Sequence, residues 1–340
     1  MEESPAVAEM RRNIFDRRIM LKNIAGCLGG AALLMPYVDQ FGSDIITWND
    51  NEDRVSFVKT GMDGMYPHTS WLVLPGYGHK SGQRLAGALQ PTMSQYGQVA
   101  YAKYSDDGLD VNRLADKIAS TFREREIDTA YLYGNSMGGM IEVAMVKRLQ
   151  RLGIKIGLLV LDCTPVNFSA VRTEKGQGVG LMETTDKVSL YGGSLCRFLI
   201  EYPQRMVDDK YSASEAFESS LDKASSSSAS NKLLQSESLY VYTYDPFKFK
   251  GTIDRGIPVI HIGPQDDEKD NVVYNTYSKR IWKQVVPQMR ALWHPDIGHA
   301  NPHREPDAYN EVLWQGARMM QLPDATQARL DDYGPLRRVA

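Results

Sequence analysis

The amino-acid sequence predicts an α/β fold in which a mostly parallel central sheet is flanked by helices. Short apolar runs alternate with amphipathic patterns over much of the chain, as expected where helices cover both faces of a parallel sheet. The runs at 71–75 and 156–161 are continuously apolar, which is typical of strands buried on both faces. The alternation stops near residue 166 and resumes near residue 252, which predicts an inserted helical lid.

Residues 43–165 form the first part of the predicted core. Two short strands at 45–48 and 55–59 flank a polar turn and predict an antiparallel opening to the sheet. Asp110 is a candidate N-cap for the amphipathic helix that follows it. The remaining elements are expected in the order helix 82–93, strand 99–104, helix 111–125, strand 129–133, helix 140–149 and strand 156–161.

Residues 166–251 form the predicted lid insertion, and residues 252–322 form the second part of the core. The insertion has helical patches at 195–206 and 214–221 and a serine-rich stretch at 224–230. In the second part of the core we expect a strand at 257–262, a helix at 273–285, a loop at 293–299 and a closing helix at 306–320. Residues 323–340 are a polar tail.

The composition argues against a nucleic-acid-binding protein. The net charge is −3, and no basic stripe occurs outside the N-terminal region. The cysteines form no C-x-x-C motif and allow at most one disulfide, so we interpret them as small buried residues. They are Cys27, Cys163 and Cys196.

Three histidines near the C-terminus have a spacing that invites a zinc interpretation. They are His294, His299 and His303. Pro295 and Pro302 interrupt any helical face that the three could share, so the sequence predicts no metal site there.

Residues 1–42 differ in character from the rest of the chain. A basic stretch is followed by a short apolar run that begins at Ile24, which is the order found in export signals. The pair Arg17-Arg18 and the residues after it resemble the twin-arginine export motif. The apolar run is short for a full membrane span. We therefore expect an exported protein, or one that associates with a membrane through residues 24–38, with a helix of a cytoplasmic protein as the alternative.

The segment Gly134-Asn-Ser136-Met-Gly138 places a serine between two glycines, where a strand gives way to a helix. A turn sharp enough to project a serine hydroxyl strains the backbone and needs small residues two positions before and after. Ser136 is therefore the candidate nucleophile. A serine hydroxyl also needs a base and a carboxylate that orients the base, and Asp266 and His299 follow in the chain order of the nucleophile-elbow hydrolases.

These segments together resemble the α/β-hydrolase fold superfamily over residues 44–165 and 252–322. The likeness rests on four segments of the chain in the family's order. They are Leu74-Pro75-Gly76-Tyr77-Gly78 for the oxyanion loop, Gly134 to Gly139 for the nucleophile turn, Gly263-Pro-Gln-Asp266 for the acid, and Gly298-His299 through Glu305-Pro306 for the base. In the first segment proline stands where the family usually has histidine.

The resemblance implies that Ser136 is the nucleophile, His299 the base and Asp266 the acid. It also implies an oxyanion hole formed by the backbone N–H groups of Tyr77 and Met137. The expected reaction is hydrolysis of a carboxylic ester or related acyl bond of a small molecule through an acyl-enzyme. Neither a metal nor an organic cofactor is implied.

Several neighbouring residues remain as alternatives or as residues without a catalytic role. Asp267 and Asp162 are alternatives for the acid, whereas Asp270 is interpreted as a solvated loop carboxylate. His261 is expected in the core, His303 at the surface or in a structural role, and His79 is a candidate for substrate contact.

Two other classes of function fit the same sequence. The first is another activity on the same fold, such as an acyltransferase or a peptidase, because these share the nucleophile turn. The second is a non-catalytic binding protein, although such proteins usually lack a member of the triad and this chain retains all three.

Overall fold

The structure of the protein is a computed structural model that describes residues 51–59, 66–172, 229–320 and 322. The predicted strand at 45–48, the helical patches at 195–206 and 214–221, most of the serine-rich stretch and the polar tail lie outside the described residues, as does the N-terminal segment. Within the part that is described, no helix has the length and apolar character needed to cross a membrane.

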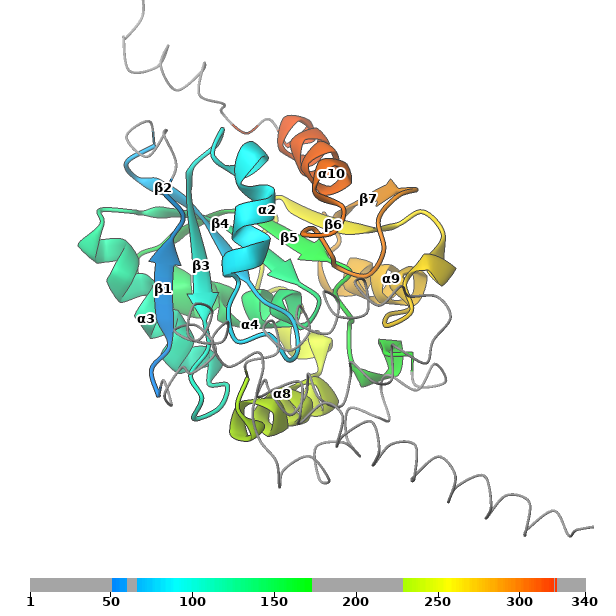
Figure 1. Ribbon diagram of the computed structural model, residues 1–340, viewed down its shortest axis with the longest axis horizontal. Helices are drawn as coiled ribbons and strands as arrows, with labels where there is room; N and C mark the ends of the chain where they lie inside the picture. The colour runs from blue at the N-terminus through cyan, green and yellow to red at the C-terminus, as the bar shows by residue number, and fades with distance from the viewer. Residues whose placement is uncertain (1–50, 60–65, 173–228, 321, 323–340) are drawn as a thin grey trace, which may run out of the picture. The chain divides into compact units, whose positions relative to one another are not determined.

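The described strands form one seven-stranded sheet in the order β1-β3-β2-β4-β5-β6-β7 (Figure 1). β1 pairs with β3 in the antiparallel sense, and every other neighbouring pair is parallel. The predicted α/β class with a mostly parallel sheet is therefore confirmed. The strands are β1 Arg54–Phe57, β2 Thr69–Leu74, β3 Gln98–Lys103, β4 Thr129–Asn135, β5 Lys155–Asp162, β6 Val259–Pro264 and β7 Arg290–His294.

Helices cover both faces of the sheet (Figure 1). α2 Gln83–Met93 and α10 Pro306–Met319 pack against each other on one face. The other face carries α3 Val111–Glu124, α4 Met137–Arg151 and α9 Asn275–Val285. α8 Asn231–Thr243 and three short 3₁₀ turns, η1 Phe168–Ala170, η2 Pro246–Phe249 and η3 Asp267–Lys269, complete the described elements.

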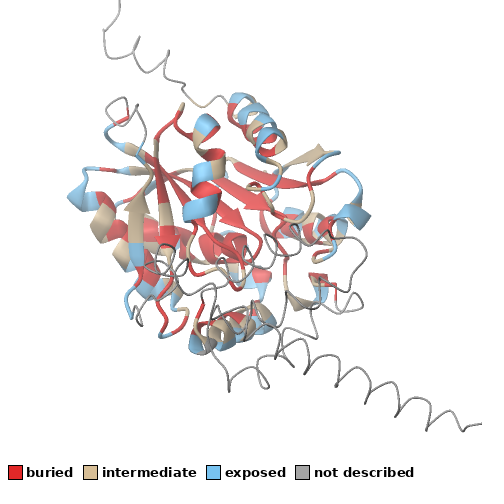
Figure 2. Ribbon diagram, in the orientation of Figure 1, coloured by how far each residue is buried: buried red, intermediate tan, exposed pale blue. Residues whose placement is uncertain are grey.

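Alternate side chains of the central strands enter two separate cores. In β2, Trp71 and Val73 pack with α2 and α10, whereas Leu72 and Leu74 pack with α3 and α4. All four side chains are fully buried, as predicted for a strand covered on both faces. Figure 2 shows the same pattern, with buried central strands and helices that expose their outer faces.

Most predicted elements in the described residues are found within a few positions of their expected ends. The carboxylate of Asp110 accepts hydrogen bonds from the backbone N–H groups of Asn112 and Arg113, which confirms it as the N-cap of α3. β7 is the main difference, because Trp293 and His294 belong to this strand although the sequence predicts a loop from residue 293. β7 is an edge strand without fully buried residues, so it lacks the apolar signal of the central strands.

Candidate active site

Ser136 occupies a strained turn between β4 and α4. Its φ of 52° and ψ of −117° lie outside the regions that residues with a side chain normally adopt. Such a conformation costs about 1–3 kcal/mol and persists only where the surrounding structure enforces it. The backbone N–H of Ser136 donates to the carbonyl oxygen of Asp162 at 2.8 Å, which ties the turn to the end of β5.

The turn is possible because the three glycines around Ser136 have no side chains. A Cβ added to Gly134 would lie 2.3 Å from the Cα of Gly139, and one added to Gly138 would lie 2.4 Å from the carbonyl oxygen of Leu74. These distances confirm the predicted need for small residues at both positions. Gly139 is also constrained, since its Cβ would lie 2.0 Å from Oγ1 of Thr164.

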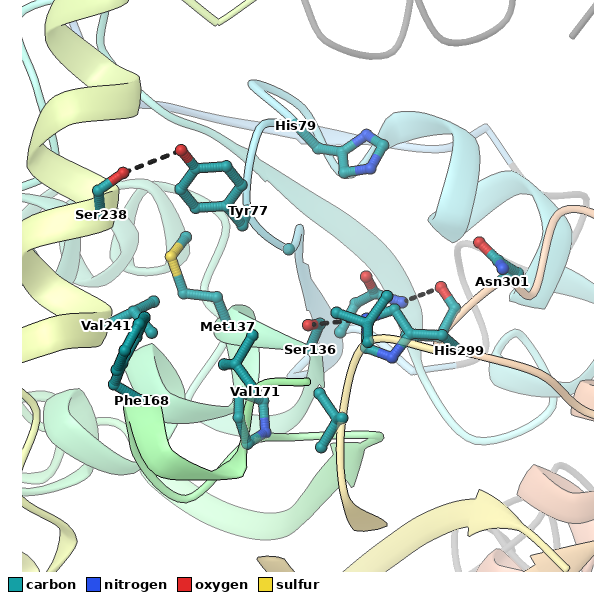
Figure 3. Close-up of a pocket in the computed structure, with 16 residues that line it drawn as sticks. Tyr77, His79, Ser136, Met137, Phe168, Val171, Ser238, Val241, His299 and Asn301 are labelled. Atoms are coloured by element: carbon teal, nitrogen blue, oxygen red, sulfur yellow. Dashed lines mark hydrogen bonds between the residues drawn. The ribbon is translucent and has the colours of Figure 1, made fainter. Parts of the chain in front are cut away.

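His299 lies between Ser136 and a buried carboxylate. Its Nε2 lies 3.1 Å from Oγ of Ser136, a contact drawn as a dashed line in Figure 3. Its Nδ1 lies 2.9 Å from Oδ2 of Asp270. The loop that carries His299 is fixed by the N–H of Gly298, which donates to Oε2 of Glu305 at 2.9 Å. The structure therefore brings two of the three predicted triad residues together.

The carboxylate that bonds His299 is Asp270, so the expectation for Asp266 is corrected. Asp266 is exposed, and its Oδ1 accepts the N–H of Glu268 at the start of η3. The 3₁₀ turn η3 follows, and only after it does the chain return toward His299 and bury Asp270. The interpretation of Asp270 as a solvated loop carboxylate is thus wrong.

Asp270 is held rigidly by its own hydrogen bonds. Its Oδ1 accepts the backbone N–H groups of Val272 and Val273, each at 2.8 Å. Its Oδ2 accepts the Nδ2 group of Asn275 at 2.6 Å, in addition to its contact with His299. Asp267, the adjacent alternative, instead accepts from Arg172 at 3.4 Å and from the N–H of Thr276 at 3.2 Å.

The electrostatics of the pair favour a charged carboxylate beside a basic imidazole. Burial lowers the pKa of His299, but the charge of Asp270, its hydrogen bond and the charge of Asp162 outweigh burial and raise the pKa above 6.5. Burial raises the pKa of Asp270, but the charge and hydrogen bond of His299 and two backbone N–H groups outweigh it, so the pKa falls below 3.8. Asp270 is therefore ionised at neutral pH.

Asp162 supports the site from the end of β5 without a hydrogen bond to His299. Its Oδ2 accepts from the hydroxyl of Tyr133 at 2.7 Å and from Nδ2 of Asn135 at 3.1 Å. Asn135 also donates to the carbonyl oxygen of Ala300 at 2.7 Å, which links Asp162 to the residue after His299. Burial raises the pKa of Asp162 to about 6, although these donors and His299 oppose the rise.

The two residues of the expected oxyanion hole both line the same cavity as Ser136. Met137 is the first residue of α4, where N–H groups have no acceptor within the helix. Tyr77 lies in the loop after β2, and this loop approaches the turn closely. A Cβ added to Gly76 would lie 3.0 Å from Oδ1 of Asn135 and 3.2 Å from Cβ of Ser136.

The cavity beside Ser136 has a volume of about 220 Å³ and two chemically different ends. Figure 3 shows Phe168, Val171 and Val241 on one side of Ser136, and His79 and Asn301 on the other. His79, the candidate for substrate contact, thus lines the cavity. The apolar lining is completed by Met137, Pro165, Val272, Val273 and Ala300.

Among the described residues, one group has the composition of a metal site. Atoms of Cys163, Asp270 and His299 lie within 4.8 Å of one another. Burial raises the pKa of the Cys163 thiol well above its usual value, which disfavours the thiolate that a metal requires. The carboxylate and the imidazole already bond each other, so the group fits a hydrogen-bonded pair better than a metal centre.

His261 and His303 do not belong to the hydrogen-bonded group of Ser136, His299 and Asp270. His261 is fully buried in β6, as predicted, and burial lowers its pKa to about 4. Burial, followed by the charges of Arg84 and Arg304, lowers the pKa of His303 to about 4. Both imidazoles are therefore neutral at pH 7.

Comparison of the sequence with protein-family models and with curated proteins found no match. Comparison of the structure with solved structures found many. One is a carboxylesterase from the thaumarchaeon Nitrososphaera gargenis, with 13% identity and a TM-score of 0.57, covering 82% of this chain and 98% of the other. A second is an esterase from Exiguobacterium antarcticum, with 14% identity and a TM-score of 0.55, covering 78% and 95%.

A third is a hydrolase from Oleispira antarctica, with 12% identity and a TM-score of 0.55, covering 80% of this chain and 95% of the other. At such low identity the likeness concerns the fold, and it extends over almost the whole length of each neighbour. Together with the strand order, these comparisons show that the chain has the α/β-hydrolase fold.

Proposed function

We propose that this protein is a serine hydrolase that cleaves a carboxylic ester or a related acyl bond. The observation that carries the proposal is the continuous contact from Oγ of Ser136 to Nε2 of His299, at 3.1 Å, and from Nδ1 of His299 to Asp270, at 2.9 Å. This is the arrangement that makes a serine hydroxyl nucleophilic. The esterases and hydrolases among the structural neighbours support the same class of reaction.

The first step is attack on the acyl carbonyl. Because Asp270 is ionised and faces Nδ1, the neutral ring carries its proton on Nδ1 and presents the lone pair of Nε2 to Ser136. Nε2 takes the hydroxyl proton as Oγ bonds the carbonyl carbon. Asp270 stabilises the imidazolium that results and keeps its own charge.

The carbonyl oxygen becomes negatively charged in this step. The backbone N–H groups of Met137 and Tyr77 are the proposed donors to it, from the helix start and from the loop after β2. In well-studied enzymes the loss of one such donor costs about 3–4 kcal/mol of transition-state stabilisation.

The remaining steps complete the acylation of Ser136 and then release the acyl group. His299 gives its proton to the departing alcohol, and the acyl group remains on Ser136. His299 then removes a proton from water as the water oxygen bonds the acyl carbon. It gives this proton to Oγ of Ser136 as the bond between Oγ and the acyl carbon breaks and the acid leaves. All of these transfers use Nε2 of His299.

The apolar end of the cavity is the proposed acyl site. Phe168, Val171 and Val241 present hydrocarbon surface beside Ser136, and the cavity of about 220 Å³ suits a short acyl chain. We expect esters of short acids to be hydrolysed faster than esters of long ones. A Val241→Trp substitution should shift the preference further toward acetyl esters.

A fluorophosphonate probe tests the proposal directly, because it reacts with a serine hydroxyl that a neighbouring base has activated. The wild-type protein should be labelled at Ser136, as located by peptide mass spectrometry, and should hydrolyse p-nitrophenyl acetate. Both activities should be lost in Ser136→Ala and in His299→Ala. Ser120→Ala, on α3, is the matched control and should behave as the wild type. Undiminished hydrolysis by Ser136→Ala would overturn the proposal.

The reaction with p-nitrophenyl acetate also separates hydrolysis from acyl transfer. Adding a primary alcohol allows an acyl-enzyme to give either the free acid or a new ester. We expect the acid to predominate in dilute alcohol. A new ester as the main product would reassign the protein as an acyltransferase that uses the same Ser136.

A further inference from the structure

The α8 helix makes two hydrogen bonds to the loop that follows β2. The backbone N–H of Gly78 donates to Oε2 of Glu237 at 2.9 Å. One residue further along the helix, Oγ of Ser238 lies 2.9 Å from the hydroxyl oxygen of Tyr77, a contact drawn in Figure 3. The two bonds join residues 159 and 161 positions apart in the sequence.

A third contact holds the beginning of the same loop. The hydroxyl of Tyr104, which follows β3, donates to the carbonyl oxygen of Pro75 at 2.9 Å. The loop is thus held at Pro75 by the residue that follows β3, and at Tyr77 and Gly78 by residues of α8. The N–H of Tyr77, a proposed oxyanion donor, lies between these fixed points.

The hydrogen bond that Gly78 donates to Glu237 is buried. Glu237 is fully buried, and a carboxylate in such a position requires polar partners to offset the loss of water. Gly78 has a φ of +77°, a conformation that glycine adopts without strain, so the bond also fixes a residue that is otherwise free to rotate.

We propose that Glu237 and Ser238 are positioning residues that set the direction of the Tyr77 N–H, and that α8 thereby assembles the oxyanion hole. This inference rests on the proposed function. The orientation of the peptide between Gly76 and Tyr77 depends on the backbone angles on both sides of it. Tyr104 holds the N-terminal side at Pro75, and Glu237 holds the C-terminal side at Gly78. Neither side chain touches the substrate's reacting atoms in this role.

Four substitutions on one helix test the proposal. Glu237→Ala removes the acceptor for Gly78, and Ser238→Ala removes the partner of Tyr77. Glu237→Gln keeps an oxygen that can accept the same N–H, so it should rescue most of the loss. Gln235→Ala, at an exposed position of α8, is the control for changes to the helix itself.

The measurements are kcat and KM for p-nitrophenyl acetate and the Kd of a trifluoromethyl ketone, which forms an oxyanion on Ser136. Outright loss of an oxyanion donor lowers kcat about 10²–10³-fold, and misdirection of one should cost less. We expect Glu237→Ala to lower kcat about 10-fold to 100-fold with little change in KM, and to weaken ketone binding in parallel. Ser238→Ala should act in the same direction by a smaller factor.

The outcomes distinguish this inference from the proposed function. Wild-type kcat and ketone affinity in a folded Glu237→Ala protein would overturn the role of α8 while leaving the proposed function intact. If Glu237→Ala does not fold, kcat and ketone affinity in Ser238→Ala equal to those of the wild type would overturn it instead. A wild type that neither hydrolyses the ester nor reacts with the fluorophosphonate would overturn both.

Discussion

The carboxylate of Asp270 lies 2.9 Å from Nδ1 of His299, and its other oxygen accepts two backbone N–H groups. The carboxylate therefore cannot rotate without losing hydrogen bonds, and it holds the imidazole in one orientation. The chain reaches this arrangement by the turn η3, which separates Asp270 from the end of β6.

Replacement of Asp270 by asparagine should lower kcat/KM about 10²–10⁴-fold without unfolding the protein. An asparagine amide does not stabilise the imidazolium and permits the wrong tautomer of His299. Ester hydrolysis under first-order conditions measures the ratio directly. Asp266→Asn is the matched control, because Asp266 only caps η3 and asparagine is an equally good cap. Loss of activity in Asp266→Asn but not in Asp270→Asn would restore Asp266 as the acid.

The activity should rise with pH as His299 loses its proton. The neutral imidazole is the base, and Asp270 and Asp162 raise its pKa above 6.5 despite burial. We therefore expect the acidic limb of kcat/KM to have its midpoint above pH 6.5. In Asp270→Asn the negative charge that raises the pKa of His299 most is absent, so the midpoint should move to lower pH. An unchanged midpoint in that variant would show that another group controls the limb.

The parts of the fold that the sequence predicts best are the central strands. β2, β4 and β5 are buried on both faces, so each appears in the sequence as an unbroken apolar run. β7 pairs on one side only and keeps its side chains partly exposed, which removes this signal. The antiparallel partner of β1 is β3, a pairing that no local pattern specifies.

In the candidate site, too, the residues that could be predicted are those with a local sequence signal. Ser136 and His299 could be predicted because each lies in a short segment whose spacing has a local steric or hydrogen-bonding reason. Asp270 could not be chosen over Asp266, because both follow the same strand and only the path of η3 decides which one becomes buried. The bonds between α8 and the loop after β2 could not be predicted either, since they depend on tertiary packing between residues 159 and 161 positions apart in the sequence.

Gly138→Ala should both destabilise the protein and abolish most of its activity. The new methyl group would lie 2.4 Å from the carbonyl oxygen of Leu74, so β2 or the turn at Ser136 must move. Overpacking of this kind costs about 1–3 kcal/mol. Urea unfolding measures the loss. Gly87→Ala, at an open position of α2, should instead stabilise the protein by about 1 kcal/mol, so equal effects of the two substitutions would contradict the steric argument.

Asp162 should make the stability of the protein depend on pH. Burial raises its pKa from 3.8 to about 6, so the folded state binds the proton more tightly than the unfolded state does. This contribution to stability is fully present below about pH 4 and is lost as the pH rises through 6. The difference between the two pKa values corresponds to about 3 kcal/mol.

Asp162→Asn removes this titration while keeping an oxygen for the hydroxyl of Tyr133. The unfolding free energy of the variant minus that of the wild type should therefore be larger at pH 7 than at pH 4, by up to about 3 kcal/mol. The free energy of unfolding in urea, measured at both pH values, gives the difference. Asp128→Asn, at an exposed position before β4, is the control and should show a much smaller change. If the difference in unfolding free energy between Asp162→Asn and the wild type is the same at pH 4 and pH 7, the buried carboxylate does not titrate between these values and the prediction is wrong.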